Sequence, residues 1–325
     1  MSEPIPSLPR EHRAWAWSGG KASFGLHLEE QPLPKVPGNA VLVANRAIGL
    51  NPVDWKILGA DFMRDGHVPG VDGAGVVAAV GDGVSPEWLG RNVAYHQDLR
   101  FPHGSFAEYT PVAVRALIRM PDALSFEDAA AFPCPGLTAW RALEKLPAAE
   151  GRSLLVWGAG GSVGHYLVQL AVSRGWHVTV ACNARHWEHL QKLGAQACRA
   201  VGKIDPEPRF HAAIDTVGPE SAAHLAGTLK ANGHLVCIQG RVETWPCAPF
   251  GRSLSLHEVA LGALHQCGDS DDWARLTLAG ETVLNEIASG RIVPEPHVPH
   301  GFDTLAQALD RLRTRNFTGK ALVLL

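Results

Sequence analysis

A glycine-rich segment, LLVWGAGGSVG at residues 154–164, constrains the fold more than any other part of the chain. Its first four residues are apolar, which is typical of a buried parallel strand. The glycines that follow allow a tight turn into the apolar helical run His165–Arg174. Such a turn brings the backbone close to a pyrophosphate, which binds at the positive end of the helix. The segment therefore predicts that the chain binds a dinucleotide.

The glycine spacing departs from the strict G-x-G-x-x-G pattern. The glycines fall at Gly158, Gly161 and Gly164, with Gly160 as an additional one. A glycine pattern alone is also typical of an ordinary turn, but the preceding strand and the following helix supply the context that dinucleotide binding requires. The residues expected to hold the pyrophosphate are Gly158, Gly160, Gly161, Ser162 and Val163.

The composition of the chain changes near residue 136. Residues 12–130 are rich in Gly, Pro and β-branched residues, and runs such as AVLVANRAIGL and RNVAYHQ predict strands separated by turns. Strands and helices then alternate, which predicts βαβ units and a parallel sheet. Residues 270–325 are too few for a third domain, so we expect them to complete the β domain. The predicted domains are 1–130 with 270–325, and 131–269.

The period of the apolar residues predicts the individual elements of the second part of the chain. Strands are expected at 153–157, 177–181, 212–215, 234–238, 254–258 and 320–325. Helices are expected at 163–174, 185–193, 221–229, 273–289 and 304–313.

The length and charge of the chain exclude several classes of protein. A chain of 325 residues suits two domains, each with its own core. A net charge of −3 gives no electrostatic reason to bind nucleic acid or an anionic membrane. No apolar run approaches the ~18 residues of a membrane span, and the sequence MSEPIPSLPREHRAW lacks the apolar centre of a signal peptide. We expect a cytoplasmic protein whose partner is a small molecule, without nucleic acid or membrane.

Several further motifs follow one another along almost the whole chain. They are LNPVDWK (50–56), VPGVDGAGVVAAVG (68–81), GRNVAYH (90–96), GSFAEY (104–109), LSFEDAAAFPCPGLTAW (124–140), IDTVG (214–218), HLVCIQGR (234–241) and TGKALVL (318–324). Together with the glycine turn, they resemble the medium-chain dehydrogenase/reductase superfamily, in its zinc-free quinone-oxidoreductase-like branch. The resemblance implies an α/β protein with a GroES-like β catalytic domain and a Rossmann domain, a doubly wound parallel sheet. It also implies hydride transfer with a nicotinamide cofactor and allows a homodimer.

The chain differs from its relatives in two places. Arg91 stands where most relatives carry an acidic residue, which we interpret as a surface difference. The segment between Ala200 and His211 is shorter than usual, which predicts that one crossover of the Rossmann domain is trimmed.

The ligands of a catalytic zinc are missing from the positions that the superfamily uses. Its zinc alcohol dehydrogenases carry a Cys on the first catalytic loop, a G-H-E turn and a later Cys or His, because zinc needs N and S ligands. Here Asn51 takes the place of the first Cys, and the turn reads Gly70-Val71-Asp72. A short loop without cysteine between His96 and Gly104 replaces the structural zinc lobe. The sequence therefore predicts no metal.

The end of the second Rossmann strand favours NADPH over NADH. NAD enzymes place Asp or Glu there, but this chain reads Cys182-Asn183-Ala184-Arg185. Asn183 and Arg185 can donate hydrogen bonds to a 2′-phosphate, although Arg185 could instead simply begin a helix and face solvent. Further cofactor contacts are expected, from their places at strand ends and at the start of a helix, at Thr138, Val217, Gly218, Ile238, Gln239 and Gly240.

The catalytic candidates are Asn51, Lys56 and Tyr95. The resemblance implies that Lys56 is placed like the lysine of trans-acting enoyl reductases, which share the N-P-V-D-W-K run. A lysine near the reacting carbonyl can stabilise an enolate oxygen or relay a proton, but Lys56 and Asp54 could equally form a structural ion pair. Tyr95 and His96 follow a strand and could line the ligand cleft expected between the two predicted domains, where Tyr can donate a proton.

The leading functional hypothesis is an NADPH-dependent reductase of quinones or of activated C=C bonds in enones, acting without metal. An enoyl-thioester reductase is the alternative among enzymes. It would need a long channel and a basic patch for a carrier protein, and no Lys/Arg cluster indicates one. A non-catalytic NADPH-binding protein is the alternative from another class. The substrate itself cannot be inferred from the sequence, because fold does not determine function.

Overall fold

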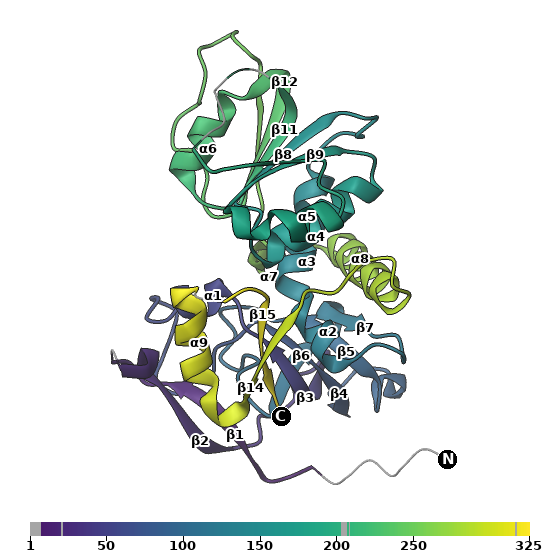
Figure 1. Ribbon diagram of the computed structural model, residues 1–325. Helices are drawn as coiled ribbons and strands as arrows, with labels where there is room; N and C mark the ends of the chain where they lie inside the picture. Colours follow the sequence, from purple (N-terminus) through teal and green to yellow (C-terminus); the bar gives the residue numbers. More distant parts are fainter. Residues whose placement is uncertain (1–7, 21, 203–206, 208, 316) are drawn as a thin grey trace. The chain divides into compact units, whose positions relative to one another are not determined.

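The protein is described by a computed structural model that covers all residues except 1–7, 21, 203–206, 208 and 316 (Figure 1). The chain divides into two compact units, Met1–Cys134 with Gly262–Leu325, and Pro135–Leu261. The sequence placed the second boundary at 269/270 instead. The difference arises because helix α7 (Gly262–Cys267) belongs to the first unit.

The first unit contains two β-sheets. A two-stranded antiparallel sheet joins β1 (Glu11–Trp17) and β2 (Leu26–Pro32). The other sheet has the strand order β14-β15-β3-β4-β5-β7, and β6 pairs with β3. The C-terminal strand completes this sheet, since β15 pairs antiparallel with β3 and places Val323 opposite Ile48. The strands of this sheet are β3 (Ala40–Gly49), β4 (Asp72–Val80), β5 (Asn92–His96), β6 (Tyr109–Ala113), β7 (Leu117–Arg119), β14 (His297–Gly301) and β15 (Lys320–Leu324).

Helices and a buried apolar cluster close the first unit. Leu305 and Leu309 on one face of α9 are buried in a core with Trp15 and Phe106. The indole Nε1 of Trp15 also donates a hydrogen bond to the carbonyl oxygen of Phe302, at 2.9 Å. This core therefore joins β1 to the segment that contains Phe302 and α9. The helices are α1 (Pro52–Lys56), α2 (Phe126–Ala131), α7, α8 (Ser270–Ala288) and α9 (Leu305–Thr314), with short 3-10 turns η1 (Ala22–Gly25), η2 (Pro86–Trp88), η3 (Val114–Ala116) and η5 (Phe302–Thr304).

The second unit is a six-stranded parallel sheet with the order β10-β9-β8-β11-β12-β13. In chain order this is 3-2-1-4-5-6, the arrangement of a Rossmann sheet. The result confirms the predicted fold class. The strands are β8 (Ser153–Trp157), β9 (His177–Ala181), β10 (Ala197–Arg199), β11 (Phe210–Asp215), β12 (Leu229–Cys237) and β13 (Ser255–Glu258), and the helices are α4 (Ser162–Ser173), η4 (Ala184–His186), α5 (Trp187–Lys192) and α6 (Pro219–Ala226). Helix α3 (Pro133–Glu144) contains the junction between the units.

Two details of the second unit, the crossover before β11 and the end of α6, bear on the predictions. The crossover from β10 to β11 spans residues 200–209, and its described residues form no helix. Part of the predicted trimmed segment, 203–206 and 208, lies outside the described residues. The helix predicted at 221–229 ends at Ala226 because the chain enters β12 at Leu229.

Within the part of the chain that the structure describes, no helix combines the length and apolarity needed to cross a bilayer.

Candidate functional site

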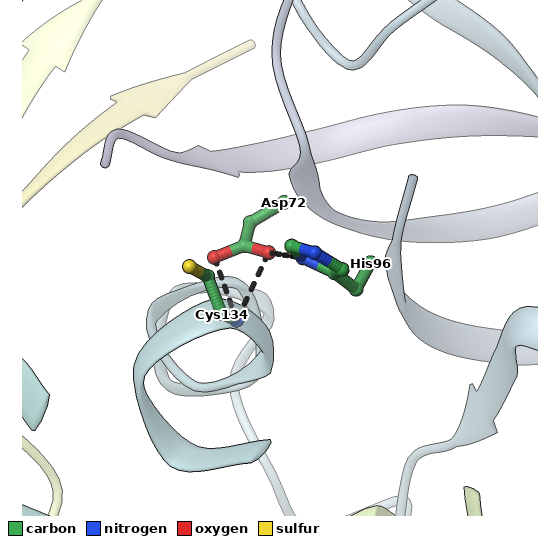
Figure 2. Close-up of side chains that lie close together, drawn as sticks. All are labelled: Asp72, His96 and Cys134. Atoms are coloured by element: carbon green, nitrogen blue, oxygen red, sulfur yellow. Dashed lines mark hydrogen bonds and ion pairs between the residues drawn. The ribbon is translucent and has the colours of Figure 1, made fainter. Parts of the chain in front are cut away.

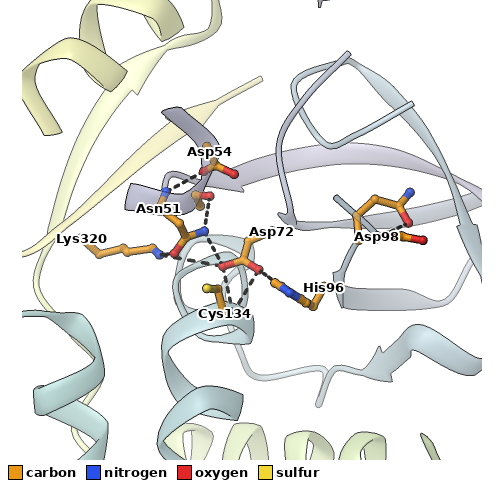
Figure 3. Close-up of polar contacts among 9 residues, drawn as sticks. Asn51, Asp54, Asp72, His96, Asp98, Cys134 and Lys320 are labelled. Carbon is orange, nitrogen blue, oxygen red and sulfur yellow. Dashed lines mark hydrogen bonds and ion pairs between the residues drawn. The ribbon is translucent and has the colours of Figure 1, made fainter. Parts of the chain in front are cut away.

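The first unit holds a cluster of buried polar side chains around Asp72 (Figures 2 and 3). The Asp72 side chain is wholly buried and accepts hydrogen bonds at both carboxylate oxygens. Asn51 Nδ2 donates to Oδ2 at 2.8 Å, and His96 Nδ1 lies 2.9 Å from Oδ1. The backbone N–H of Cys134 lies 3.0 Å from each oxygen. A buried carboxylate needs such donors, because without them its burial costs several kcal/mol.

The sheet register and two helix ends bring these residues together. Asp72 begins β4, where it pairs with His96 on β5 and with Gly49 on β3. Asn51 follows β3 and caps the N-terminus of α1. Cys134 is the second residue of α3, so its N–H has no acceptor within the helix and can bind the carboxylate.

A buried lysine completes the cluster. Lys320, the first residue of β15, is only 2% exposed, and its Nζ donates to Asn51 Oδ1 at 2.6 Å. The same ammonium lies 3.9 Å from Asp72 Oδ2, so it balances the charge of the carboxylate. The sequence analysis assigned Lys320 no role. A lysine that begins an apolar strand, in TGKALVL, was the available signal.

The predicted catalytic residues on α1 have different environments. Asn51 is 3% exposed and donates its amide hydrogens to Gly49 O and Asp72 Oδ2, which gives it a structural role in the cluster. Asp54 is fully buried and accepts the N–H of Asn51 at 2.7 Å, and burial raises its pKa to about 8. Lys56 is exposed, with its Nζ 5.7 Å from the centre of the Trp55 ring. Partial burial, and then Arg315, lower the pKa of Lys56.

Tyr95 and His96 were predicted to follow a strand and line the cleft together, but both lie within β5 and face opposite sides of the sheet. The two are neighbours on β5, and successive side chains of a strand point to opposite faces of the sheet. His96 meets Asp72, whereas Tyr95 is fully buried and donates its hydroxyl to Asn45 Oδ1 at 2.8 Å. Burial also raises the pKa of the Tyr95 hydroxyl well above its usual value. These facts argue against the predicted proton donation by Tyr95.

Three groups of the cluster are of the kinds that bind zinc. A carboxylate oxygen of Asp72, a ring nitrogen of His96 and the thiol of Cys134 lie within 4.8 Å of one another (Figure 2). Their wide separation in the sequence hid this grouping. Both oxygens of Asp72 are nevertheless engaged, and the Lys320 ammonium already supplies the positive charge. A dication would lie beside this buried ammonium and be repelled by it. The residues therefore do not fit a resident zinc ion.

A cavity of about 620 Å³ lies elsewhere in the first unit, within the usual size range of small-molecule sites. Its lining includes Gln97, Phe101, Arg115 and His265. One lining residue, His265, lies near the Asp72 cluster, with its ring 6.3 Å from the His96 ring, centre to centre.

The glycine turn of the second unit follows β8. Gly158 has φ +79°, and a Cβ there would lie 2.4 Å from Thr216 Oγ1, so the fold itself requires glycine at this position. A Cβ at Gly161 would meet no atom within 4 Å. Helix α4 begins at Ser162, followed by Val163, one residue before the predicted start. The fold therefore leaves open space where the turn meets the helix.

Asp215 fixes the backbone that follows β11, next to the glycine turn in the sheet. Its carboxylate, wholly buried at the end of β11, accepts the N–H groups of Val217 at 3.0 Å and Gly218 at 2.7 Å. Val217 is 57% exposed, which is unusual for a large apolar side chain. The N–H of Ile238 bonds to Asp215 O, which joins the next strand end to this turn. Sequence analysis did not single out Asp215.

The other predicted cofactor residues lie at strand ends or in a helix. Gln239 and Gly240 follow β12, and Gly240 has φ +130°. Thr138 is 8% exposed. It was predicted to start a helix, but it does not. It lies in the second turn of α3, because a proline is tolerated in the first turn and the helix begins at Pro133.

The segment after β9 carries the predicted cofactor-specificity residues. Asn183 precedes η4, and its Oδ1 accepts the N–H of Arg185 at 3.1 Å. Arg185 is exposed and lies in the middle of the turn. Its Nε donates to His186 Nε2 at 3.0 Å, so the side chain is held by its neighbour.

The sequence and the fold can now be compared with known proteins. The family of the alcohol dehydrogenase GroES-like domain matches residues 37–122. The chain is 32% identical to a 2-methylene-furan-3-one reductase of Solanum lycopersicum, over 98% of this chain and 80% of that protein. It is 29% identical to the chloroplastic NADPH-dependent alkenal/one oxidoreductase of Arabidopsis thaliana, with the same coverage of each chain.

A solved structure extends the similarity to the whole fold. A putative NADPH:quinone reductase from Bacillus thuringiensis superimposes with a TM-score of 0.85, covering 98% of this chain and 100% of that one. At 22% identity this match concerns the fold alone. From the motifs, the fold and the full-length relatives, the chain belongs to the medium-chain dehydrogenase/reductase superfamily, in its quinone-oxidoreductase-like branch.

Proposed function

We propose that the protein is a cytoplasmic, NADPH-dependent reductase of quinones or enones that works without a metal ion. The observation that carries the proposal is the closed cluster of Asp72, Asn51 and Lys320. The family resemblance puts Asn51 where zinc relatives have their first cysteine ligand. Here the ammonium group of Lys320 and the hydrogen bonds of Asn51 and Asp72 fill that region. We therefore expect no Lewis acid there to polarise an alcohol or a simple carbonyl. The acceptor must therefore be activated already, as a conjugated carbonyl or a quinone is.

The residues of the second unit fit a dinucleotide with a 2′-phosphate. Gly158, Gly160 and Gly161, with the first residues of α4, would hold the pyrophosphate. The exposed Arg185, together with Asn183, would bind the 2′-phosphate, since no carboxylate stands at the end of β9. When bound, NADPH supplies the hydride for the reduction. Thr138 and the strand ends at Val217–Gly218 and Ile238–Gly240 are the proposed contacts of the rest of the cofactor.

Lys56 is the proposed donor to the oxygen of the substrate. It is exposed and its pKa is lowered, which makes proton donation easier than from an ordinary lysine. Asn51 and Asp54 hold the α1 segment from which Lys56 extends. Tyr95 takes no part in this scheme, because its hydroxyl is buried and already donates to Asn45.

The test is a screen of NADPH oxidation over quinones, enones, enoyl thioesters and simple alcohols, the alcohols being assayed with NADP⁺. We expect turnover with a quinone or an enone. Turnover confined to enoyl thioesters would favour the alternative enoyl-thioester reductase. Tight NADPH binding without turnover of any acceptor would favour a non-catalytic binding protein, and oxidation of simple alcohols would contradict the proposed reaction class.

A further inference from the structure

We infer that His186 is a positioning residue that sets the preference for a 2′-phosphate by holding the guanidinium of Arg185 in place. The inference rests on the proposed use of NADPH. His186 is the last residue of η4 and is not among the predicted cofactor residues, and its contacts with Arg185 and Gly160 indicate its role.

The hydrogen bond between the two side chains has a defined direction. Arg185 Nε can only donate, so His186 Nε2 accepts at 3.0 Å and must carry a lone pair. His186 is 8% exposed, and burial, followed by Arg185 and His189, lowers its pKa, which keeps the ring neutral and able to accept. The bond engages Nε, so the two terminal amino groups of the guanidinium can form a fork around a phosphate.

His186 also links this arginine to the glycine turn. A Cβ on Gly160 would lie 2.5 Å from His186 Cδ2, so the imidazole packs directly against the turn. On the other side, Asn183 Oδ1 fixes the backbone of Arg185. Arg185 is thus presented beside the backbone proposed to hold the pyrophosphate. A pre-positioned guanidinium loses less side-chain entropy when it binds phosphate than a free one would.

A simpler role for His186 is packing against Gly160, and two substitutions separate the two roles. His186→Phe keeps a ring against the turn but removes the acceptor. His186→Gln keeps an acceptor near the position of Nε2. Arg185→Ala removes the phosphate donor itself. Arg152→Ala is a matched control, because Arg152 lies at the opposite end of β8 in an exposed pair with Glu150.

The experiment is calorimetric titration of the wild type and these variants with NADPH and with NADH. We expect His186→Phe to weaken NADPH binding by about 10-fold and NADH binding by less than about 2-fold, with His186→Gln close to the wild type. Arg185→Ala should weaken NADPH binding by about 10- to 100-fold.

The outcomes distinguish this inference from the proposed function. The positioning role is wrong if His186→Phe retains NADPH affinity, if it weakens the binding of both cofactors equally, or if His186→Gln does not recover the affinity. In each of these cases, a selective loss of NADPH binding in Arg185→Ala would still support the proposed use of NADPH. If the wild type binds NADH as tightly as NADPH and Arg185→Ala changes neither, both the proposed cofactor and the role of His186 are overturned. Thermal unfolding of each variant identifies any loss of folded protein, and His186→Gln still tests the acceptor if His186→Phe does not fold.

Discussion

The Asp72 cluster of the first unit and the glycine turn of the second are built on opposite plans. In the cluster, the carboxylate of Asp72 and the amide of Asn51 are engaged by buried partners, including the ammonium of Lys320. At the turn, a Cβ on Gly161 would meet nothing and Arg185 is exposed. A network that satisfies itself stabilises the fold, whereas an open arrangement of donors is available to a ligand. Polar residues gathered in one place are therefore not by themselves a binding site.

Breaking the cluster should have the largest effect. Replacing Lys320 by Met leaves the buried carboxylate of Asp72 without its balancing charge. We expect this change to lower the free energy of unfolding by about 3–5 kcal/mol, as measured by urea denaturation. The control is Lys192→Met, which removes an exposed pair with Glu188 and should leave the stability almost unchanged, because solvent screens exposed pairs. A loss in Lys320→Met no larger than in the control would show that the cluster does not stabilise the unit.

Removing the proposed oxygen donor should lower activity while leaving the fold intact, because Lys56 is exposed. Lys56→Ala is expected to lower kcat/KM by about 10²–10³ on the best quinone or enone, since one donor to an oxyanion has about this effect. NADPH affinity and thermal stability should change little. Lys35→Ala, another exposed lysine of the first unit, is the control. Full activity in Lys56→Ala would return Lys56 to a structural role on α1.

The smallest expected effect, taken per unit of pH, concerns Asp54. Burial raises its pKa to about 8 in the folded protein, above the ordinary value of 3.8, so the folded state keeps a proton that the unfolded state loses. The stabilisation is therefore complete below the ordinary pKa of 3.8 and is lost as pH rises from there through about 8, by up to about 1.4 kcal/mol per pH unit. Asp54→Asn cannot ionise, so its stability relative to the wild type should rise between pH 5 and pH 8. Parallel stability–pH curves for the two proteins would contradict the assignment.

How far the sequence predicts each region follows from how the region is built. The glycine turn, the strand ends and the residues after β9 are contiguous, so their roles could be inferred from local pattern. The Asp72 cluster joins residues of β4, β5 and β15 with the starts of α1 and α3, and the sheet register and these two helix ends bring them together. The separation of Tyr95 from His96 was predictable in principle, because side chains alternate along a strand. For Lys320 the sequence offered only its place at the start of an apolar strand, and its role could not be predicted because its partners are distant in the sequence.

The most direct test of the central claim is the rate of NADPH oxidation with the best quinone or enone, before and after exhaustive dialysis against a zinc chelator. We predict an unchanged rate and well under one equivalent of zinc in protein purified without chelator. This follows because the ammonium of Lys320, not a metal ion, balances the charge of Asp72. Activity that disappears on dialysis and returns with added zinc would contradict the account and identify Asp72, His96 and Cys134 as metal ligands.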